Sequence, residues 1–173
     1  LASFDAIDDC SRTIYGKAYD VENDQNAMDF VTELLAHTNF PIRAIKVDNR
    51  YGQDFQTYCE QVLRIQVIYN DPYCPQQNGK IERYHRTLKQ EFYYTYISFF
   101  DSFDTINYKY RLWQNYYNTK RKHYGYGMDG LTPKQKLLQA TLQGMVNNII
   151  NHPGKVTRTL QQYKTSRFFP DMV

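Results

Sequence analysis

The chain has 173 residues, of which 42% are hydrophobic, so we expect one globular domain with its own core and not a disordered chain. No run of about 18 apolar residues is present, so no membrane span is expected. The three cysteines form no CxxC pair and the four histidines show no ligand spacing, which argues against a disulfide framework or a zinc site and favours a reducing cytosol.

The net charge of +3 is unevenly distributed along the chain. Residues 1–79 hold 6 Lys and Arg against 12 Asp and Glu, whereas residues 80–173 hold 15 against 6. A basic half that is rich in tyrosine suits a phosphate backbone and stacked bases, although a solvated basic surface explains the composition equally well.

Turn residues and apolar periodicity predict the element order β-β-α-β-α-β-α-α, followed by one more helix, and so a mixed sheet flanked by helices. The predicted hairpin comprises residues 1–8 and 13–19, and its turn lies at Asp9–Arg12. Asn23 or Asp24 caps the first helix. The later elements are strands at 42–47 and 65–69, a short helix over 55–62, helices over 81–92 and 104–117, and a helix that Thr132 and Pro133 open.

Two carboxylates stand out by their place in this order. Asp48 follows a strand, at the sheet edge where ligands tend to bind, and Glu82 lies at the start of a helix after a loop that contains Asn78-Gly79. Two such carboxylates can converge on divalent cations. The alternative for Glu82 is an ion pair with Arg86 on a solvated helix face.

Several runs of the sequence resemble the integrase catalytic core of bacterial insertion-sequence transposases, which are relatives of retroviral integrases. The most specific run is PYCPQQNGKIERYHRTLKQEF at residues 72–92. The others are AIDDCSR at 6–12, KVDN at 46–49 with QDF at 53–55, WQNYYNTKRKHYGYG at 113–127 and LTP at 131–133. The resemblance covers residues 1–138 and leaves residues 139–173 as a C-terminal tail of unknown role.

This resemblance implies an RNase H-like fold and an Asp-Asp-Glu triad that holds two Mg²⁺ or Mn²⁺ ions. Asp48 matches the second Asp and Glu82 matches the Glu, with 33 residues between them. The resemblance further implies DNA as partner, a homo-oligomer when intact, and a nucleoid-associated location in the bacterial cytoplasm. The residues implied in DNA contact are Gln76, Gln77 and Asn78 in the loop, and Lys80, Arg83, Arg86 and Lys89 on or beside the helix.

Two departures from the family pattern matter. Between Asp48 and Phe55 the chain has two extra residues and lacks one glycine, which alters the loop beside the expected metal site. The family's first Asp lies on a central first strand that the chain lacks, since Leu1 matches the second strand. Asp5 and Asp8 are alternative metal ligands, but turn formation, with Arg12 as an ion-pair partner, is the preferred role for Asp8 and Asp9. We therefore predict a gap or makeshift pairing between residues 1–7 and 42–47.

The leading hypothesis is the catalytic domain of a transposase or integrase, with an N-terminal truncation, that performs metal-dependent DNA cleavage and strand transfer. The alternative is a catalytically inert remnant that still binds DNA. A remnant with neither activity and a plain RNase H nuclease are further possibilities, because a fold does not fix a function.

Overall fold

The computed structural model describes residues 2–71 and 79–151. In these ranges no helix combines the length and the apolar character needed to span a membrane.

The predicted element order is confirmed. The strands are β1 (Ala2–Ile7), β2 (Ile14–Tyr19), β3 (Ala44–Val47) and β4 (Gln66–Tyr69). The helices are α1 (Asp24–His37), α2 (Gln53–Thr57), α3 (Gly79–Leu88), α4 (Tyr94–Tyr96), α5 (Phe103–Thr119) and α6 (Pro133–Asn151). Single π-helical turns at Tyr58–Val62 and Lys89–Tyr93 extend α2 and α3.

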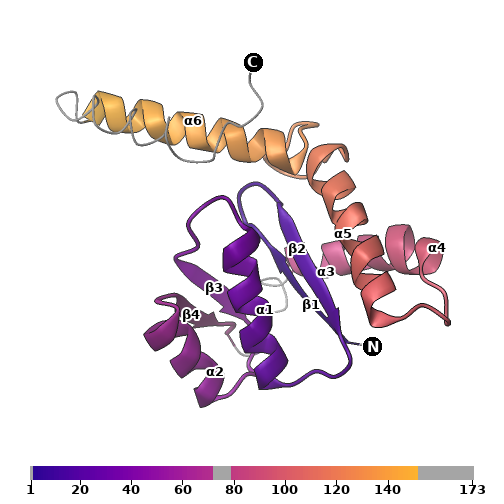
Figure 1. Ribbon diagram of the computed structural model, residues 1–173. Helices are drawn as coiled ribbons and strands as arrows, with labels where there is room; N and C mark the ends of the chain where they lie inside the picture. Colours follow the sequence, from indigo (N-terminus) through magenta and orange to yellow (C-terminus); the bar gives the residue numbers. More distant parts are fainter. Residues whose placement is uncertain (1, 72–78, 152–173) are drawn as a thin grey trace.

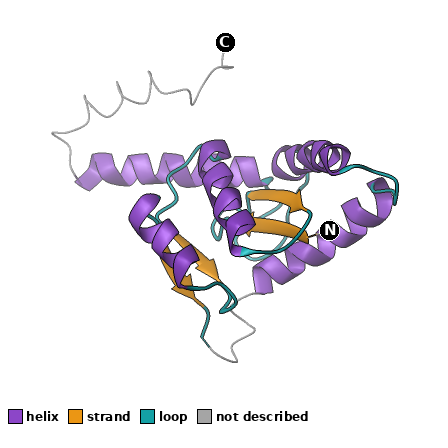
Figure 2. Cartoon of the chain, turned by 60° about the horizontal axis from the view of Figure 1, so that its bottom comes forward, coloured by secondary structure: helices purple, strands orange, loops and turns teal. Residues whose placement is uncertain are grey.

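The described strands form two separate pairs (Figures 1 and 2). Strands β1 and β2 are antiparallel, with Ala2 opposite Tyr19, and strands β3 and β4 are parallel, with Ala44 opposite Gln66. No ladder joins β1 to β3 in the described ranges, so the predicted gap between these segments is confirmed.

Two apolar clusters hold the elements together. The first joins the hairpin, α1, α2 and β4 through residues such as Phe4, Phe30 and Val67. The second joins the hairpin to α3 and α5, and its residues are Ile14, Tyr84, Leu88, Phe92, Tyr110, Trp113 and Tyr117. The apolar stripes predicted for α3 and α5 are therefore the buried faces of these helices.

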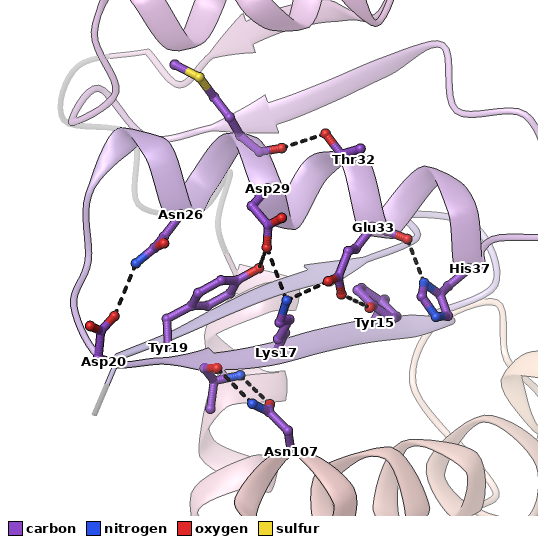
Figure 3. A network of polar contacts seen from close by, with 12 residues as sticks. Tyr15, Lys17, Tyr19, Asp20, Asn26, Asp29, Thr32, Glu33, His37 and Asn107 are labelled. Atoms are coloured by element: carbon purple, nitrogen blue, oxygen red, sulfur yellow. Dashed lines mark hydrogen bonds and ion pairs between the residues drawn. The ribbon is translucent and has the colours of Figure 1, made fainter. Parts of the chain in front are cut away.

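Polar side chains also fix α1 on the hairpin (Figure 3). The Lys17 ammonium lies 2.5 Å from Glu33 Oε1 and 3.1 Å from Asp29 Oδ2. Tyr19 donates to Asp29 at 2.8 Å and Tyr15 donates to Glu33 at 3.0 Å. Because these strand side chains alternate along β2 and their partners lie one turn apart on α1, the contacts set one register between strand and helix.

The outer edge of β2 is closed by side-chain amides of α5. The Gln114 amide accepts from Gly16 N and donates to Gly16 O, both at 2.8 Å. Asn118 makes the same pair of bonds with Ile14 at 2.9 Å each, and Asn107 makes it with Ala18 at 2.8 and 3.0 Å. These three residues, which we call the α5 amide clamp, copy the donors and acceptors of a neighbouring strand. Helix α5 therefore takes the place of a strand at this edge.

Candidate nucleic-acid and metal site

Asp48 lies directly after β3 and is half-buried. Its carboxylate is engaged by Arg50, whose Nε lies 2.7 Å and whose Nη2 lies 2.6 Å from Asp48 Oδ2. Arg50 also pairs with Glu22, and its hydrogen bond with Asp48 raises the pKa of the guanidinium. Arg50 belongs to the segment that departs from the family pattern, so the altered loop supplies a cation to this carboxylate.

Glu82 lies in the first turn of α3 and is exposed. Among the described residues it makes no ion pair, so the pair with Arg86, which was the alternative interpretation of Glu82, is not formed. A carboxylate in the first turn of a helix is favoured by the helix dipole. The side chain is therefore free to bind a cation.

Basic side chains lie along the solvent side of the same helix. Arg83, Arg86 and Lys89 are exposed, and within the described ranges none of them forms an ion pair. Lys80 instead pairs with the carboxylate of Asp9 in the hairpin turn. The opposite face of α3 is buried, so the helix presents a one-sided basic surface, which we call the α3 basic face (Arg83, Arg86 and Lys89). The loop amides Gln76, Gln77 and Asn78 lie outside the described residues.

A buried polar network beside α3 was not predicted. The Asp5 side chain is 2% exposed and accepts a hydrogen bond from Tyr110, whose hydroxyl lies 2.6 Å from that of Tyr84. Ser3 donates to the same carboxylate at 2.9 Å, and His85 Nε2 lies 3.3 Å from it.

Gly16 leaves room for this network, because a Cβ there would overlap Asp5 and Tyr110. The period-two pattern of β1 places Asp5 on one face of the strand, but no local signal in the sequence identifies Tyr110, which is 105 residues away.

The alternative metal roles of Asp5 and Asp8 find no support in these contacts. The Asp5 carboxylate is directed into the second cluster, between tyrosine hydroxyls. Asp8 accepts from Ser11 N and from Ser11 Oγ at 2.7 Å each, so its predicted role in the turn is confirmed. The predicted ion pair of Arg12 is wrong, because its guanidinium donates to the backbone carbonyl of Asp9.

The donor chemistry of Asp48 and Glu82 fits a hard divalent cation, since Mg²⁺ is commonly held by one or two carboxylates together with water and phosphate oxygens. The described residues contain no group of three His, Cys, Asp or Glu side chains that could hold a metal by itself. A cation at Asp48 also has to displace the Arg50 guanidinium.

The geometry can be compared with known proteins. Residues 63–133 match the integrase core domain family, a segment that contains Glu82 and the α3 basic face but not Asp48. A Gag-Pro-Pol polyprotein of squirrel monkey retrovirus is 38% identical over 71 residues, which is 39% of this chain and 4% of the polyprotein.

Solved structures of similar fold include an integrase catalytic core domain and an intasome. The catalytic core domain of BIV integrase has a TM-score of 0.62 and 21% identity, covering 82% of this chain and 88% of that one. A simian T-cell lymphotropic virus intasome, in complex with PP2A regulatory subunit B56 gamma, has a TM-score of 0.60 and 21% identity, covering 75% of this chain and 45% of that one.

These structures define the class of fold, which is the RNase H-like fold of retroviral integrase catalytic cores, as predicted. The family match covers residues 63–133, less than half of the chain, and together with the polyprotein it supports a relationship of this part of the chain to the integrase core domains of retroviruses.

Proposed function

We propose that the chain is the catalytic-core part of a DNA integration or transposition enzyme, and that α3 is its DNA-contacting element. The observation that carries this proposal is the α3 basic face, whose three side chains are exposed and without ion pairs among the described residues. Basic side chains that are free of internal partners can neutralise phosphates on binding and position a DNA duplex.

Asp48 and Glu82 are proposed as two ligands of the divalent cations. Bound there, a pair of such ions would activate the attacking oxygen and stabilise the leaving oxygen in a displacement at phosphorus. Glu82 is available for this role without rearrangement, whereas Asp48 has first to lose its contacts with Arg50. Gln76, Gln77 and Asn78 are proposed to meet the DNA end, and Lys80 is proposed to join them once its pair with Asp9 opens.

An inert DNA-binding domain is the second candidate function. The contact between Arg50 and Asp48 favours it, because a guanidinium occupies the carboxylate that the chemistry needs. Both candidates share the α3 basic face and differ only in catalysis.

A nicking assay on supercoiled DNA with Mn²⁺ separates the two. The catalytic proposal expects nicking by the wild-type chain and a loss on the order of 100-fold for Glu82→Gln. Asp104→Asn is the matched control, since Asp104 is an exposed carboxylate in the first turn of α5. Equal nicking by wild type and Glu82→Gln would show that Glu82 is not a ligand. DNA binding without nicking by any variant would establish the inert alternative.

A further inference from the structure

Two exposed tyrosines lie in the loop that joins α5 to α6 (residues 120–132; Figure 1). Tyr124 is 81% exposed and Tyr126 is 99% exposed. An aromatic ring that is open to solvent offers a large, flat apolar face to a ligand. Single exposed tyrosines are ordinary on protein surfaces, so the surroundings of this pair decide what it can bind.

Backbone contacts hold the loop in one shape. His123 N donates to Leu131 O at 3.1 Å and Gly130 N donates to His123 O at 2.9 Å, so the two ends of the loop are closed on each other. Between them, Met128 is 1% exposed and anchors the loop in the interior. Gly130 has a φ of 77°, which favours glycine, and a Cβ there would lie 3.2 Å from the Tyr124 ring. This ring therefore rests against the loop backbone, and a ring that is positioned in advance loses little entropy on binding.

The loop is also fixed beside the α3 basic face. Arg121, at the start of the loop, donates to both carboxylate oxygens of Glu91 in the π-helical turn that extends α3, with Nε at 2.9 Å and Nη2 at 2.6 Å. Nearer the start of α3, a Cβ built on Gly125 would lie 3.9 Å from Arg83 Nη1. Gly125 separates the two tyrosines in the sequence, so they flank the point where the loop approaches α3. Arg83 directly follows Glu82, the proposed metal ligand.

The charge around the tyrosines is mainly positive. Lys120 and Lys122 are exposed, and like Arg83 they form no ion pair within residues 2–71 and 79–151. Against these cations the loop holds one carboxylate, Asp129. Proteins that bind single strands combine cations, which hold the phosphates, with aromatic rings on which the bases stack. A duplex alone has no use for the rings, because its bases are already stacked on each other.

We propose that Tyr124 and Tyr126 form a stacking platform for unpaired bases of a DNA strand whose phosphates lie on the α3 basic face. The inference rests on the proposed DNA-contacting role of α3, and it narrows the substrate to DNA that has a single-stranded segment next to a duplex. The bases of an overhanging end have free faces for the rings, and the phosphates that flank them can pair with Arg83 and Lys122. Because Arg83 adjoins Glu82, the platform holds the single strand beside the proposed metal ligand.

The test compares three DNA ligands of the full chain by fluorescence anisotropy. A short duplex is offered with blunt ends, with an overhang of adenines, or with an equally long overhang of abasic nucleotides. We expect the adenine overhang to bind about fivefold or more tightly than the abasic overhang, which has the same phosphates but no bases. Equal affinities for the two overhangs, while the blunt duplex binds, would overturn this inference and leave the role of α3 intact. Failure of all three ligands to bind would overturn the proposed role of α3 as well.

Variants of the tyrosines locate the platform. Changing both Tyr124 and Tyr126 to leucine keeps apolar side chains but removes the flat rings, and it should lower the ratio of the two overhang affinities to about one. Tyr126→Trp keeps a flat ring and should retain the preference for adenines.

The matched control changes Tyr94 and Tyr108 to leucine, since these tyrosines are also exposed but lie outside the loop. The control should keep the wild-type ratio, and thermal unfolding shows whether each variant is folded. An unchanged ratio in the platform variant, or an equal decrease in the control, would contradict the assignment. Dimers that the platform variant dissociates, with no change in the ratio, would show that the rings contact a second copy of the chain and would overturn the inference.

Discussion

At the scale of single residues, Arg50 controls the chemistry open to Asp48. Both of its contacts to the carboxylate lie at hydrogen-bond distance, and its side chain is 57% exposed. An exposed ion pair is worth at most about 1 kcal/mol, so a cation can compete with it. The sequence indicated that this loop was altered, but it did not indicate that Arg50 turns back onto Asp48, because that contact depends on the path of the loop.

Arg50→Gln should therefore raise the affinity for Mn²⁺ about fivefold, since the cation no longer has to displace a guanidinium. Isothermal titration calorimetry measures this directly and does not require activity. Arg43→Gln, which removes an equal charge from an exposed position before β3, is the control. If Arg50→Gln and Arg43→Gln bind Mn²⁺ with the same affinity, Arg50 does not compete for the site.

His123 should make the stability of the chain depend on pH. Burial, together with the nearby Arg121, lowers its pKa to about 4, and its buried Nε2 has no hydrogen-bond partner among the described residues. In the unfolded chain a histidine has a pKa near 6.5. Between about pH 6.5 and pH 4 the unfolded state therefore binds a proton at His123 and the folded state does not. The contribution of neutral His123 to the free energy of unfolding is fully present above about pH 6.5 and is lost as the pH falls to about 4. The loss is about 2 kcal/mol after allowance for the partial exposure of the side chain.

Urea unfolding at several pH values checks this. His123→Phe removes the titrating group while keeping an aromatic ring against Tyr117, whose ring centroid lies 4.7 Å away. The variant should lose less free energy of unfolding than the wild type between pH 7 and pH 4. Parallel profiles for the two proteins would show that His123 does not titrate in this way.

At the scale of elements, α5 shows what periodicity can and cannot predict. Its apolar positions Ile106, Tyr110, Trp113 and Tyr117 were predicted from their spacing, and all are buried. The cap of α6 was also predicted, and Thr132 Oγ1 accepts from Gln135 N at 3.3 Å. The amide clamp was not predicted, because Asn and Gln beside an apolar stripe resemble an ordinary solvated flank until their strand partners are known.

Gln114→Leu should destabilise the chain by about 2–4 kcal/mol, because it leaves the N–H and C=O of Gly16 buried without partners. Asn115→Leu makes the same kind of change one residue further along α5, at an exposed position, and should cost less than about 0.5 kcal/mol. Denaturant unfolding compares the two. Similar losses for both variants would mean that the amide bonds of Gln114 contribute little.

At the scale of the whole molecule, the fold class and the order of elements could be predicted because they depend on local pattern and on a specific run of residues. The predicted gap between β1 and β3 was a consequence of topology and is confirmed. The domain boundary expected at residue 138 stays a prediction. It marks the end of the resemblance to the family and not the end of an element, since α6 continues from Pro133 to Asn151. The contacts of Asp5 with Tyr110 could not be predicted, because they join residues that are distant in the chain and adjacent only after folding.

The distribution of charge supports a DNA-binding role for the basic half of the chain. Residues 80–173 carry 15 Lys and Arg against 6 Asp and Glu, and α3 presents its basic face without internal partners in the described ranges. A remnant that does not bind DNA would have the same composition. A DNA-binding chain is distinguished from such a remnant by binding that depends on the side chains of α3. A plain nuclease would share this surface, but it would cut DNA without forming strand-transfer products, which an integrase forms.

The most direct test of the account measures DNA affinity as a function of salt concentration. Replacing both Arg86 and Lys89 with glutamine should reduce the slope of log affinity against log salt by about two, because about 0.9 counterion is released for each phosphate neutralised. Replacing Arg43 and Lys134, which are exposed and carry the same total charge, should leave the slope unchanged. An unchanged slope in the Arg86 and Lys89 variant, or an equal decrease in the control, would contradict the assignment of α3 as the DNA-contacting element.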